Sequence, residues 1–302
     1  MTLPASGPIS FEQINIELKV SPTATISLND AAVRILLGKP SGTISMQDAY
    51  GKSSEIRFVN TVARTSINIF TLMGSPTTAD RYVFENNAEI NANTASYALR
   101  TGVFPAGSTL TIINNGYIRG TGGAGSSAVA TPGGAGGDAI IIDMACSIDN
   151  TNGYIFAGGG GGGSAQRVAS ANSSHFVRAG GGGGAGSSAG VAGVNTFKLA
   201  GEYPLSNIAP NPGTATAGGA GGTISAGIEG SYIDTAYGGA GGANGAPGAV
   251  GSTTTVTFNS SSYKNTPTIG VAGAAGRAII TNGKTLTQVA GLDSTRVKGA
   301  IV

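Results

Sequence analysis

The side chains that most often carry catalysis are scarce in this chain. His175 is the only histidine and Cys146 the only cysteine among 302 residues. A serine-hydrolase triad would have to use His175, which lies in a Ser/Asn-rich stretch without a predicted element to orient it. One histidine and one cysteine cannot supply the four ligands that a structural zinc ion usually takes, and one cysteine excludes an intramolecular disulfide. We therefore expect no metal site, a buried and unreactive Cys146, and a contact role for His175.

Glycine motifs in the chain match known ligand-binding patterns without the context that those patterns require. Residues 120–125 read Gly-Thr-Gly-Gly-Ala-Gly, the dinucleotide fingerprint, but a poor helix-forming sequence follows where that site needs a helix. Residues 133–140 match the calcium-binding nonapeptide, which needs tandem copies, and the related pentads are followed by Thr223 and Ala243 instead of Asp. The Gly-Lys-Ser/Thr sequences lack the first glycine of a phosphate loop. We expect no cofactor.

Paired carboxylates are the remaining route to catalysis. The glycine-rich part of the chain has few acidic residues, and nothing in their spacing selects a pair. They are Asp138, Asp143, Asp149, Glu202, Glu229 and Asp234. The sequence therefore predicts that the protein is not an enzyme.

Five polar segments between the glycine runs hold aromatic and basic side chains among Ser, Asn and Gly. This composition is typical of binding loops, in which rigid aromatic anchors stand beside adaptable polar groups. For any single aromatic residue, packing into a minor core is an equal alternative. The candidate contact residues are His175, Phe176, Arg178, Phe197, Lys198, Tyr203, Tyr232, Tyr237, Phe258, Tyr263 and Lys264.

The block that must position these segments runs from Gly116 to Gly276. The chain has 52 glycines, and the block includes the uninterrupted runs Gly158–Gly163 and Gly180–Gly184. A flexible linker is one interpretation of such composition. Order is favoured because glycine runs alternate with apolar segments, and because Asn-Gly-Tyr-Ile recurs at 115–118 and 152–155.

Ordered polyglycine can form an extended left-handed helix with three residues per turn. That helix has no internal hydrogen bonds, so neighbouring segments must pair its backbone groups. We predict a mostly β or irregular fold, with short N-terminal helices, a small β domain, and then a bundle of polyglycine II helices with exposed loops over residues 116–276.

The other parts of the chain have their own patterns. Residues 1–52 repeat Ile-Ser-x-x-Gln/Asp three times, which predicts short capped helices. These helices either dock onto something else or form an ordinary small helical subdomain. Residues 53–115 carry β-branched and aromatic runs with period-2 alternation, which predict a small β domain. Residues 277–302 are β-like again and predict a C-terminal closure of the bundle.

Charge and hydropathy exclude several classes of partner. The net charge is +2, only 11% of residues are charged, and the basic residues are scattered, so we expect no nucleic-acid binding. No run approaches the ~18 apolar residues of a membrane-spanning helix. Residues 1–7 lack the basic and apolar regions of a signal peptide, so we expect synthesis in the cytosol without export by the general secretory route.

The opening sequence Leu-Pro-Ala-Ser-Gly-Pro-Ile-Ser at 3–10, with the later Ile-Ser-x-x-Asp copies, resembles the N-terminal segment of many tailed-bacteriophage virion proteins. Residues 116–276 resemble the glycine-rich tail-fibre adhesins of T-even-type phages. In that family polyglycine helices form a sandwich, and variable loops between the glycine motifs contact the bacterial receptor.

This resemblance implies a receptor-binding protein of the phage tail. Residues 1–52 would attach to other tail or virion proteins, and the loops would contact an outer-membrane protein or a surface glycan. Assembly in the host cytoplasm and release by lysis would need neither a signal peptide nor disulfides, and a homotrimer would fit a tail axis. One alternative is a purely structural tail, neck or capsid-decoration protein with the glycine block as a rigid spacer. The other is an ice-binding or surface-coat protein, against which the irregular loops argue.

Overall fold

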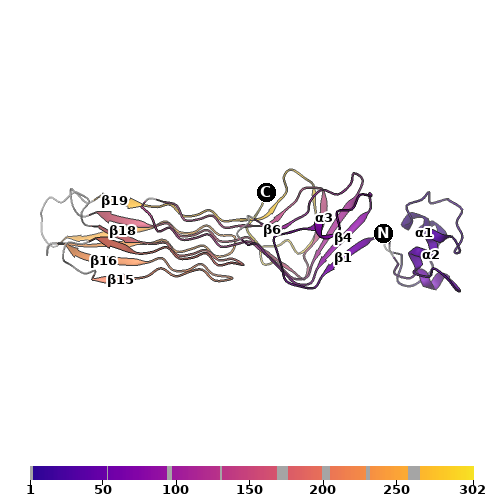
Figure 1. Ribbon diagram of the computed structural model, residues 1–302, viewed down its shortest axis with the longest axis horizontal. Helices are drawn as coiled ribbons and strands as arrows, with labels where there is room; N and C mark the ends of the chain where they lie inside the picture. Colours follow the sequence, from indigo (N-terminus) through magenta and orange to yellow (C-terminus); the bar gives the residue numbers. More distant parts are fainter. Residues whose placement is uncertain are drawn as a thin grey trace. The chain divides into compact units, whose positions relative to one another are not determined.

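The computed structural model describes residues 3–52, 54–93, 97–129, 131–168, 176–198, 205–228, 232–257 and 266–302 (Figure 1). The chain divides into two compact units, which are described separately. Unit 1 comprises Met1–Arg57 and Asp80–Val83, and unit 2 comprises Phe58–Ala79 and Phe84–Val302. Within the described residues, no helix has the length and hydropathy of a membrane span.

Short helices in unit 1 begin beside capping side chains. α1 (Phe11–Glu17) follows Ser10, whose hydroxyl accepts a hydrogen bond from the Gln13 amide while the Gln13 side chain accepts one from the Ser10 amide. This reciprocal pair satisfies two amides that the first helical turn leaves free. Before η1 (Met46–Ala49), the Asp48 carboxylate accepts a hydrogen bond from the Ser45 amide at 2.9 Å.

α2 (Ala31–Leu37) begins later than its sequence pattern indicates. The pattern places the cap at Ser27, but the amide of Asp30 donates to the Ser27 carbonyl and closes a turn, so Asp30 becomes the residue before the helix. The apolar side chains of unit 1 then meet in one small core, which consists of Leu3, Ile14, Val33, Leu37 and Ala49.

Three parallel sheets, named A, B and C, are filled in turn as the chain advances. Sheet A contains β1 (Ile56–Asn60), β4 (Arg81–Asn86), β7 (Thr109–Asn114), β10 (Cys146–Asp149) and β21 (Leu286–Ala290). Sheet B contains β2 (Arg64–Thr65), β5 (Glu89–Asn91), β8 (Tyr117–Arg119), β11 (Tyr154–Phe156) and β22 (Val297–Lys298). Sheet C contains β3 (Ile67–Asn68), β6 (Tyr97–Arg100), β9 (Asp138–Ile141), β20 (Arg277–Ile280) and β23 (Ala300–Ile301). α3 (Ile69–Leu72) follows β3.

Because the strands recur in the order A, B, C, the chain winds as a three-sided parallel coil, here called the β coil. The pairing puts apolar residues of successive turns in register inside it. In sheet C, Leu99 is paired with Ile67 on one side and with Ile140 on the other, and Ile140 is paired with Ile279. All four side chains are buried, so the stack forms one wall of the core.

A ladder of asparagine side chains stabilises the coil where strands of sheet A end. The amide nitrogen of Asn60 donates to Asn86 at 2.8 Å, Asn86 donates to Asn114 at 2.8 Å, and Asn114 donates to Asn150 at 2.7 Å. All four residues are buried. A buried polar side chain is costly unless it is hydrogen-bonded, so the repeated asparagines fix the vertical alignment of successive turns.

The chain leaves the β coil twice, each time between a strand of sheet B and a strand of sheet C. Residues 120–137 form the first excursion, between β8 and β9, and residues 157–276 form the second, between β11 and β20. The second excursion carries two antiparallel sheets, named D and E, at the end of unit 2 away from the coil (Figure 1). Sheet D contains β14 (Thr196–Lys198), β13 (Phe176–Ala179), β12 (Ala165–Val168) and β19 (Thr266–Ile269). Sheet E contains β15 (Ser206–Ile208), β16 (Thr223–Ile228), β17 (Tyr232–Tyr237) and β18 (Ser252–Thr257).

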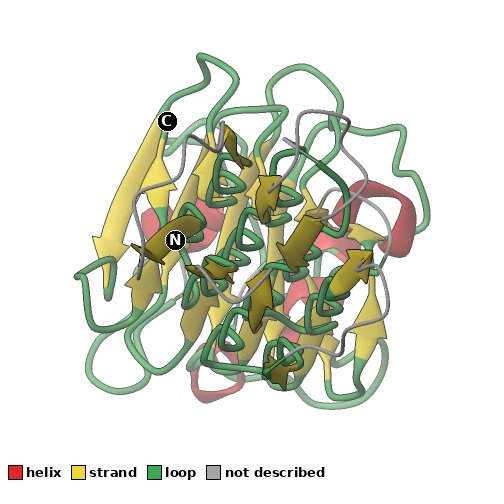
Figure 2. Ribbon diagram, turned by 90° about the vertical axis from the view of Figure 1, so that its left-hand side faces the viewer, coloured by secondary structure: helices red, strands yellow, loops and turns green. Residues whose placement is uncertain are grey.

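Glycine-rich segments without an assigned helix or strand connect these sheets to the β coil. We call them the glycine arms; they lie side by side in the end view (Figure 2). Arm 157–164 shows how they are joined, because every third amide donates to the same neighbour. Gly158 and Gly161 donate to arm 132–137, Gly159 and Gly162 donate to arm 180–186, and Gly160 and Gly163 donate to arm 246–251, at 2.8 to 3.0 Å.

At most interior positions of this arrangement only glycine fits, although Ala185 is also buried there. A Cβ atom on Gly158 would lie 1.7 Å from the carbonyl oxygen of Thr121, and one on Gly162 would lie 1.8 Å from that of Gly239. Backbones approach each other here as closely as hydrogen bonding allows, and no side chain can be inserted between them. The glycine content of the sequence is therefore a packing requirement.

The predicted fold class, a small β domain followed by a bundle of polyglycine II helices, is wrong. The described chain is mostly β, with three short α-helices and strands in both parallel and antiparallel sheets. Strands from 53–115, from the glycine-rich block and from 277–302 share sheets A, B and C. The physical reason is that apolar segments within residues 116–276, such as Ala139–Ile142, supply strands to the β coil. The sheets are therefore completed by strands from this glycine-rich block and not by residues 53–115 alone.

Candidate functional site

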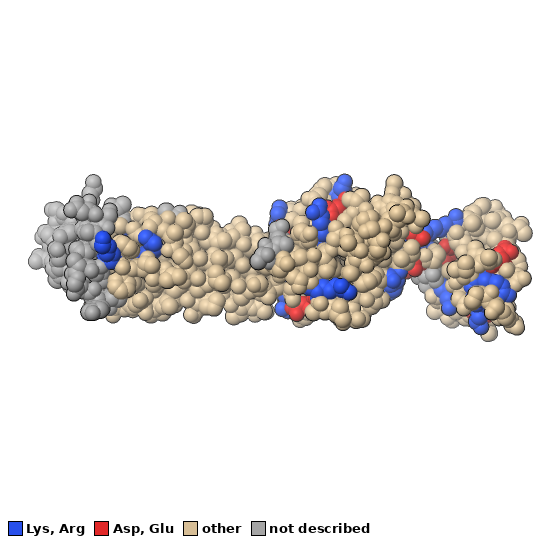
Figure 3. Space-filling view, viewed as in Figure 1, with Lys and Arg blue, Asp and Glu red and all other residues tan. Residues whose placement is uncertain are grey.

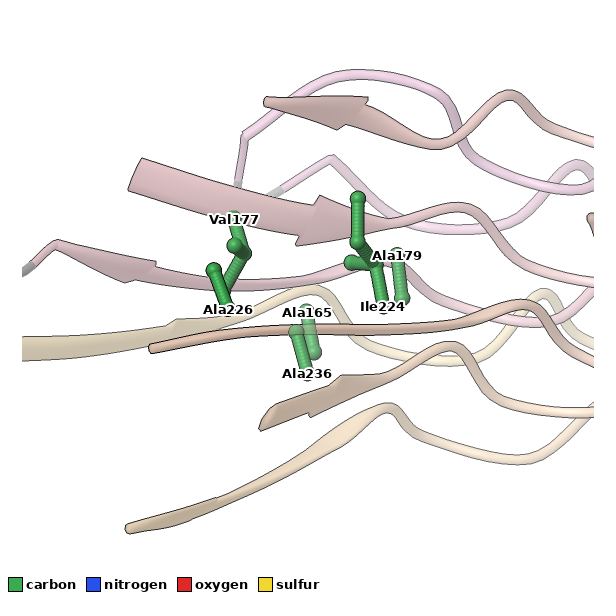
Figure 4. Close-up of a cluster of buried hydrophobic side chains, with 6 residues drawn as sticks. All are labelled: Ala165, Val177, Ala179, Ile224, Ala226 and Ala236. Atoms are coloured by element: carbon green, nitrogen blue, oxygen red, sulfur yellow. The ribbon is translucent and has the colours of Figure 1, made fainter. Parts of the chain in front are cut away.

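Sheets D and E pack face to face and form the distal sandwich (Figure 4). Its apolar core is small and consists of Ala165, Val177, Ala179, Ile224, Ala226 and Ala236. These side chains come from β12, β13, β16 and β17, each of which directly continues or precedes a glycine arm. Mostly alanine is found at these positions because the arms hold the backbones close together, which leaves little space for larger side chains.

Farther along the same inner faces, the sandwich contains a buried ion pair. Arg167, two residues beyond Ala165, lies with its Nε 3.2 Å from an Asp234 carboxylate oxygen. Arg167 also donates to the Thr253 hydroxyl at 3.0 Å, and the Thr255 hydroxyl donates to Asp234 at 2.8 Å. The carboxylate side chain is only 2% exposed. Since a buried ion pair needs such further hydrogen bonds to offset its lost hydration, this group ties β12 to β17 and β18.

The outer face of sheet D combines aromatic and basic side chains. Arg178 donates from Nε to the Gln166 side-chain oxygen at 2.9 Å and from Nη1 to the Ser127 carbonyl at 3.4 Å. Its guanidinium carbon lies 5.3 Å from the ring centroid of Phe176, in cation–π geometry. Partial burial lowers the pKa of Arg178 from its ordinary value, because the charged form has lost hydration.

Strand register adds Lys198 and Thr196 to this face. In the β13–β14 pair, Phe176 is opposite Lys198 and Arg178 is opposite Thr196. Directly opposed residues of antiparallel strands project to the same side of the sheet. Phe176, Arg178 and Lys198, which the sequence indicated separately, thus lie together on one face.

Two other predicted contact residues lie elsewhere on the distal sandwich. Phe197 is opposite Val177 on the edge strand β14, so it belongs to the other side of sheet D, and its side chain is exposed. Tyr237 ends β17 next to the inward Ala236, which places it on the outer face of sheet E, where it is exposed. Tyr232 begins β17. The remaining predicted residues, His175, Tyr203, Phe258, Tyr263 and Lys264, lie outside the described residues.

Sequence reasoning missed the partners that complete the outer face of sheet D. Gln166 holds the Arg178 guanidinium, and Thr196 lies across from it. No local signal could have identified them, because the register between β12, β13 and β14 is set by pairing across loops. In the structure, burial alternates along Phe176, Val177, Arg178 and Ala179, as in a strand with one outer face, but their residue types do not alternate between polar and apolar.

Other residues with possible chemistry are accounted for within the described ranges. Burial raises the pKa of the Cys146 thiol to about 12, which makes the thiolate rare at neutral pH. In the described part of the chain, no cluster of three His, Cys, Asp or Glu side chains has the geometry to hold a metal ion. The fingerprint sequence at 120–125 forms a glycine arm and opens no helix.

Comparison with known proteins assigns the class of molecule. A family model described as phage tail fibre adhesin Gp38 matches residues 39–302. The protein is thus an adhesin of the phage tail fibre. The chain belongs to the Gp38 family.

Among solved structures, the chain is similar to the gp37–gp38 adhesin tip complex of the bacteriophage S16 long tail fibre. The match has 20% sequence identity and a TM-score of 0.49, and it covers 99% of this chain and 100% of that chain. No curated protein sequence matches the chain. The family assignment confirms the prediction of a phage tail adhesin and favours it over a purely structural virion role.

Proposed function

We propose that this adhesin recognises a receptor on the bacterial surface with the distal sandwich, without catalysing a reaction. The observation that supports this most directly is the grouping of Phe176, Arg178 and Lys198 on the outer face of sheet D. Aromatic and basic side chains that share one partly exposed face are typical of binding surfaces. The receptor is an outer-membrane protein or a surface glycan.

The glycine arms support the same assignment by their construction. Their amides and carbonyls are paired between neighbouring arms, so the sandwich is held at the end of a cross-linked body instead of a free linker. A rigid support lowers the entropy lost when the face binds a receptor. The other predicted contacts, in the segments between the described strands, stay predictions.

Competition with whole phage tests this function. Purified full-length protein is expected to bind host cells saturably and to block phage adsorption. The variant Phe176→Ala with Lys198→Ala should block adsorption much less, whereas Lys284→Ala, an exposed residue near the C-terminus, should behave as wild type. Folded protein that neither binds cells nor competes with phage would contradict the proposal.

We further propose that unit 1 attaches the adhesin to the tail fibre. Unit 1 has its own core and an apolar groove of about 380 Å³ lined by Leu18, Ala32, Ile35, Leu36, Ser54 and Glu55. The Ile35 side chain is 76% exposed at this groove. Exposed apolar side chains beside a groove are typical of protein interfaces.

The attachment is tested by complementing adhesin-deficient phage with Ile35→Asp protein. We expect fewer adhesin copies per particle, although the isolated variant should melt at the wild-type temperature because the side chain contributes little to the core. Full incorporation would refute the role of this groove. A homotrimer, assembly in the host cytoplasm and release by lysis stay predictions.

A further inference from the structure

The outer face of sheet D has a row of polar groups centred on Arg178. Gln166 and Thr196 are its cross-strand neighbours on the two sides, and Thr268 of β19 is opposite Gln166. Gln166 is buried, and the Thr196 hydroxyl is also buried. Within the described residues, the Thr196 hydroxyl has no hydrogen-bond partner. A buried hydroxyl without a partner costs free energy that a bound ligand can offset.

Arg178 has unused donors on this face. A guanidinium offers five N–H groups, and the two hydrogen bonds of Arg178 go to neutral oxygens, those of Gln166 and Ser127. In contrast, Arg100 and Arg277 in the β coil form ion pairs with aspartates at 2.7 and 2.9 Å. No ion pair joins Arg178 to any described residue.

The charge of this part of the molecule has the sign that attracts anions. In the described residues of the second excursion, Asp234 is already paired with Arg167, which leaves Arg178 and Lys198 without a carboxylate. The space-filling view accordingly shows blue but no red on the visible described surface of the arms and the sandwich (Figure 3). A partly desolvated guanidinium beside a second cation favours an anionic ligand.

We propose that the outer face of sheet D binds the phosphate or carboxylate group of an anionic saccharide, with Arg178 and Lys198 on the anion. This rests on the proposed function and gives the chemical class of the receptor group. Arg178 is oriented by Phe176 and Gln166, and three of its five N–H groups make no hydrogen bond within the described residues, whereas a bidentate contact needs two.

A saccharide fits this face better than a protein surface does. Protein interfaces are anchored by several large apolar side chains that enter pockets, whereas Phe176 is the only aromatic side chain that the described residues place on this face, beside amide, hydroxyl and guanidinium groups. The exposed Phe197 belongs to the other side of the sheet.

The proposal is tested with the full chain in solution. Glucose 6-phosphate, glucuronate and glucose are titrated separately while the backbone amide resonances of β13 and β14 are followed by NMR. The two anions distinguish phosphate from carboxylate, and glucose is the neutral control. We expect saturable shifts with at least one anion and none with glucose, and the shifts should weaken as salt rises.

Matched variants locate the binding. Arg178→Gln and Lys198→Gln should each weaken the apparent affinity by roughly tenfold or more, which is the usual effect of losing a charge-assisted hydrogen bond. Lys284→Gln makes the same charge change on the β coil and should bind as wild type. Lys198 is exposed, so its variant tests the site even if Arg178→Gln does not fold.

Three outcomes would overturn the inference: equal shifts with glucose, equal weakening by Lys284→Gln, or no shifts with any saccharide. If the protein blocks phage adsorption but binds neither anion, the proposed receptor binding stands and the saccharide class is wrong. If adsorption requires only an outer-membrane protein, the saccharide class is likewise wrong and receptor binding stands. Anion binding by a protein that does not compete with phage would instead contradict the proposed function alone.

Discussion

Substituting alanine for Gly162 should destabilise the protein strongly, although alanine is common in the glycine arms. The new Cβ atom would lie 1.8 Å from the carbonyl oxygen of Gly239. That oxygen accepts the amide of Gly182 at 2.9 Å, and Gly162 itself donates to the Gly182 carbonyl at 2.8 Å. Because the arms are cross-linked on several sides, the Gly239 carbonyl cannot retreat without breaking a buried hydrogen bond.

The magnitude follows from these contacts. Overpacking costs about 1–3 kcal/mol, and a broken buried backbone hydrogen bond adds about 1–3 kcal/mol. Alanine recovers about 0.4–1 kcal/mol by restricting the unfolded chain. The free energy of unfolding should therefore fall by roughly 1–5.5 kcal/mol, which lowers the melting temperature by about 3 °C or more in a chain of this size.

Thermal unfolding followed by circular dichroism measures this effect. Ala220→Ser is the matched control, because it also adds one heavy atom to a glycine arm but at an exposed position, where the change should be under about 0.5 kcal/mol. If Gly162→Ala melts within about 2 °C of the wild type, the arms have room for a Cβ atom at this position. The glycine would then not be required by packing.

Four further predictions concern other parts of the molecule. Asn114→Ala breaks the buried asparagine ladder and should cost roughly 2–4 kcal/mol by calorimetry, whereas Asn115→Ala, on the exposed side, should change little; equal losses would contradict the ladder's role. Arg167→Met leaves its buried carboxylate partner without a cation and should cost about 3–5 kcal/mol in denaturant unfolding, and an unchanged midpoint would speak against that ion pair. Hydrogen bonds from a neighbouring threonine lower the pKa of Asp149, so its stabilisation is present at neutral pH and is lost as pH falls through the lowered pKa; Asp149→Asn should flatten the acid limb of the melting curve. Cys146, with its pKa of about 12, should react with thiol reagents at pH 8 only as fast as the protein unfolds, and rapid labelling of folded protein would disprove its burial.

The sequence indicated the function better than the fold. Its opening residues resemble tailed-phage virion proteins and its glycine-rich block resembles phage tail adhesins, and composition does not depend on topology. One signal of the β coil was also present, because the Asn-Gly-Tyr-Ile repeat marks strands that pair directly: Tyr154 is opposite Tyr117 and Ile155 is opposite Ile118. The rest of the coil lacked such a signal, since β20 pairs with β9 across more than a hundred intervening residues.

The candidate site was predicted by residue type but not by arrangement. Phe176 and Arg178 stood out as aromatic and basic residues in a supposed loop, but they belong to strand β13. Thr196 has no distinguishing feature in the sequence, and only the antiparallel register brings it opposite Arg178. The register between two such strands depends on how the glycine arms that carry them are hydrogen-bonded to their neighbours. Those hydrogen bonds involve glycines that lie far apart in the sequence.

The three-residue recurrence of hydrogen bonds in the glycine arms limits how related adhesins can vary in length. Removing one or two residues from arm 157–164 would direct every later amide of the arm toward the wrong neighbour. Removing three residues would leave each later amide facing the same neighbouring arm, but only if the adjoining arms were shortened by the same amount. We therefore expect insertions and deletions in the arms of natural variants to come in coordinated multiples of three.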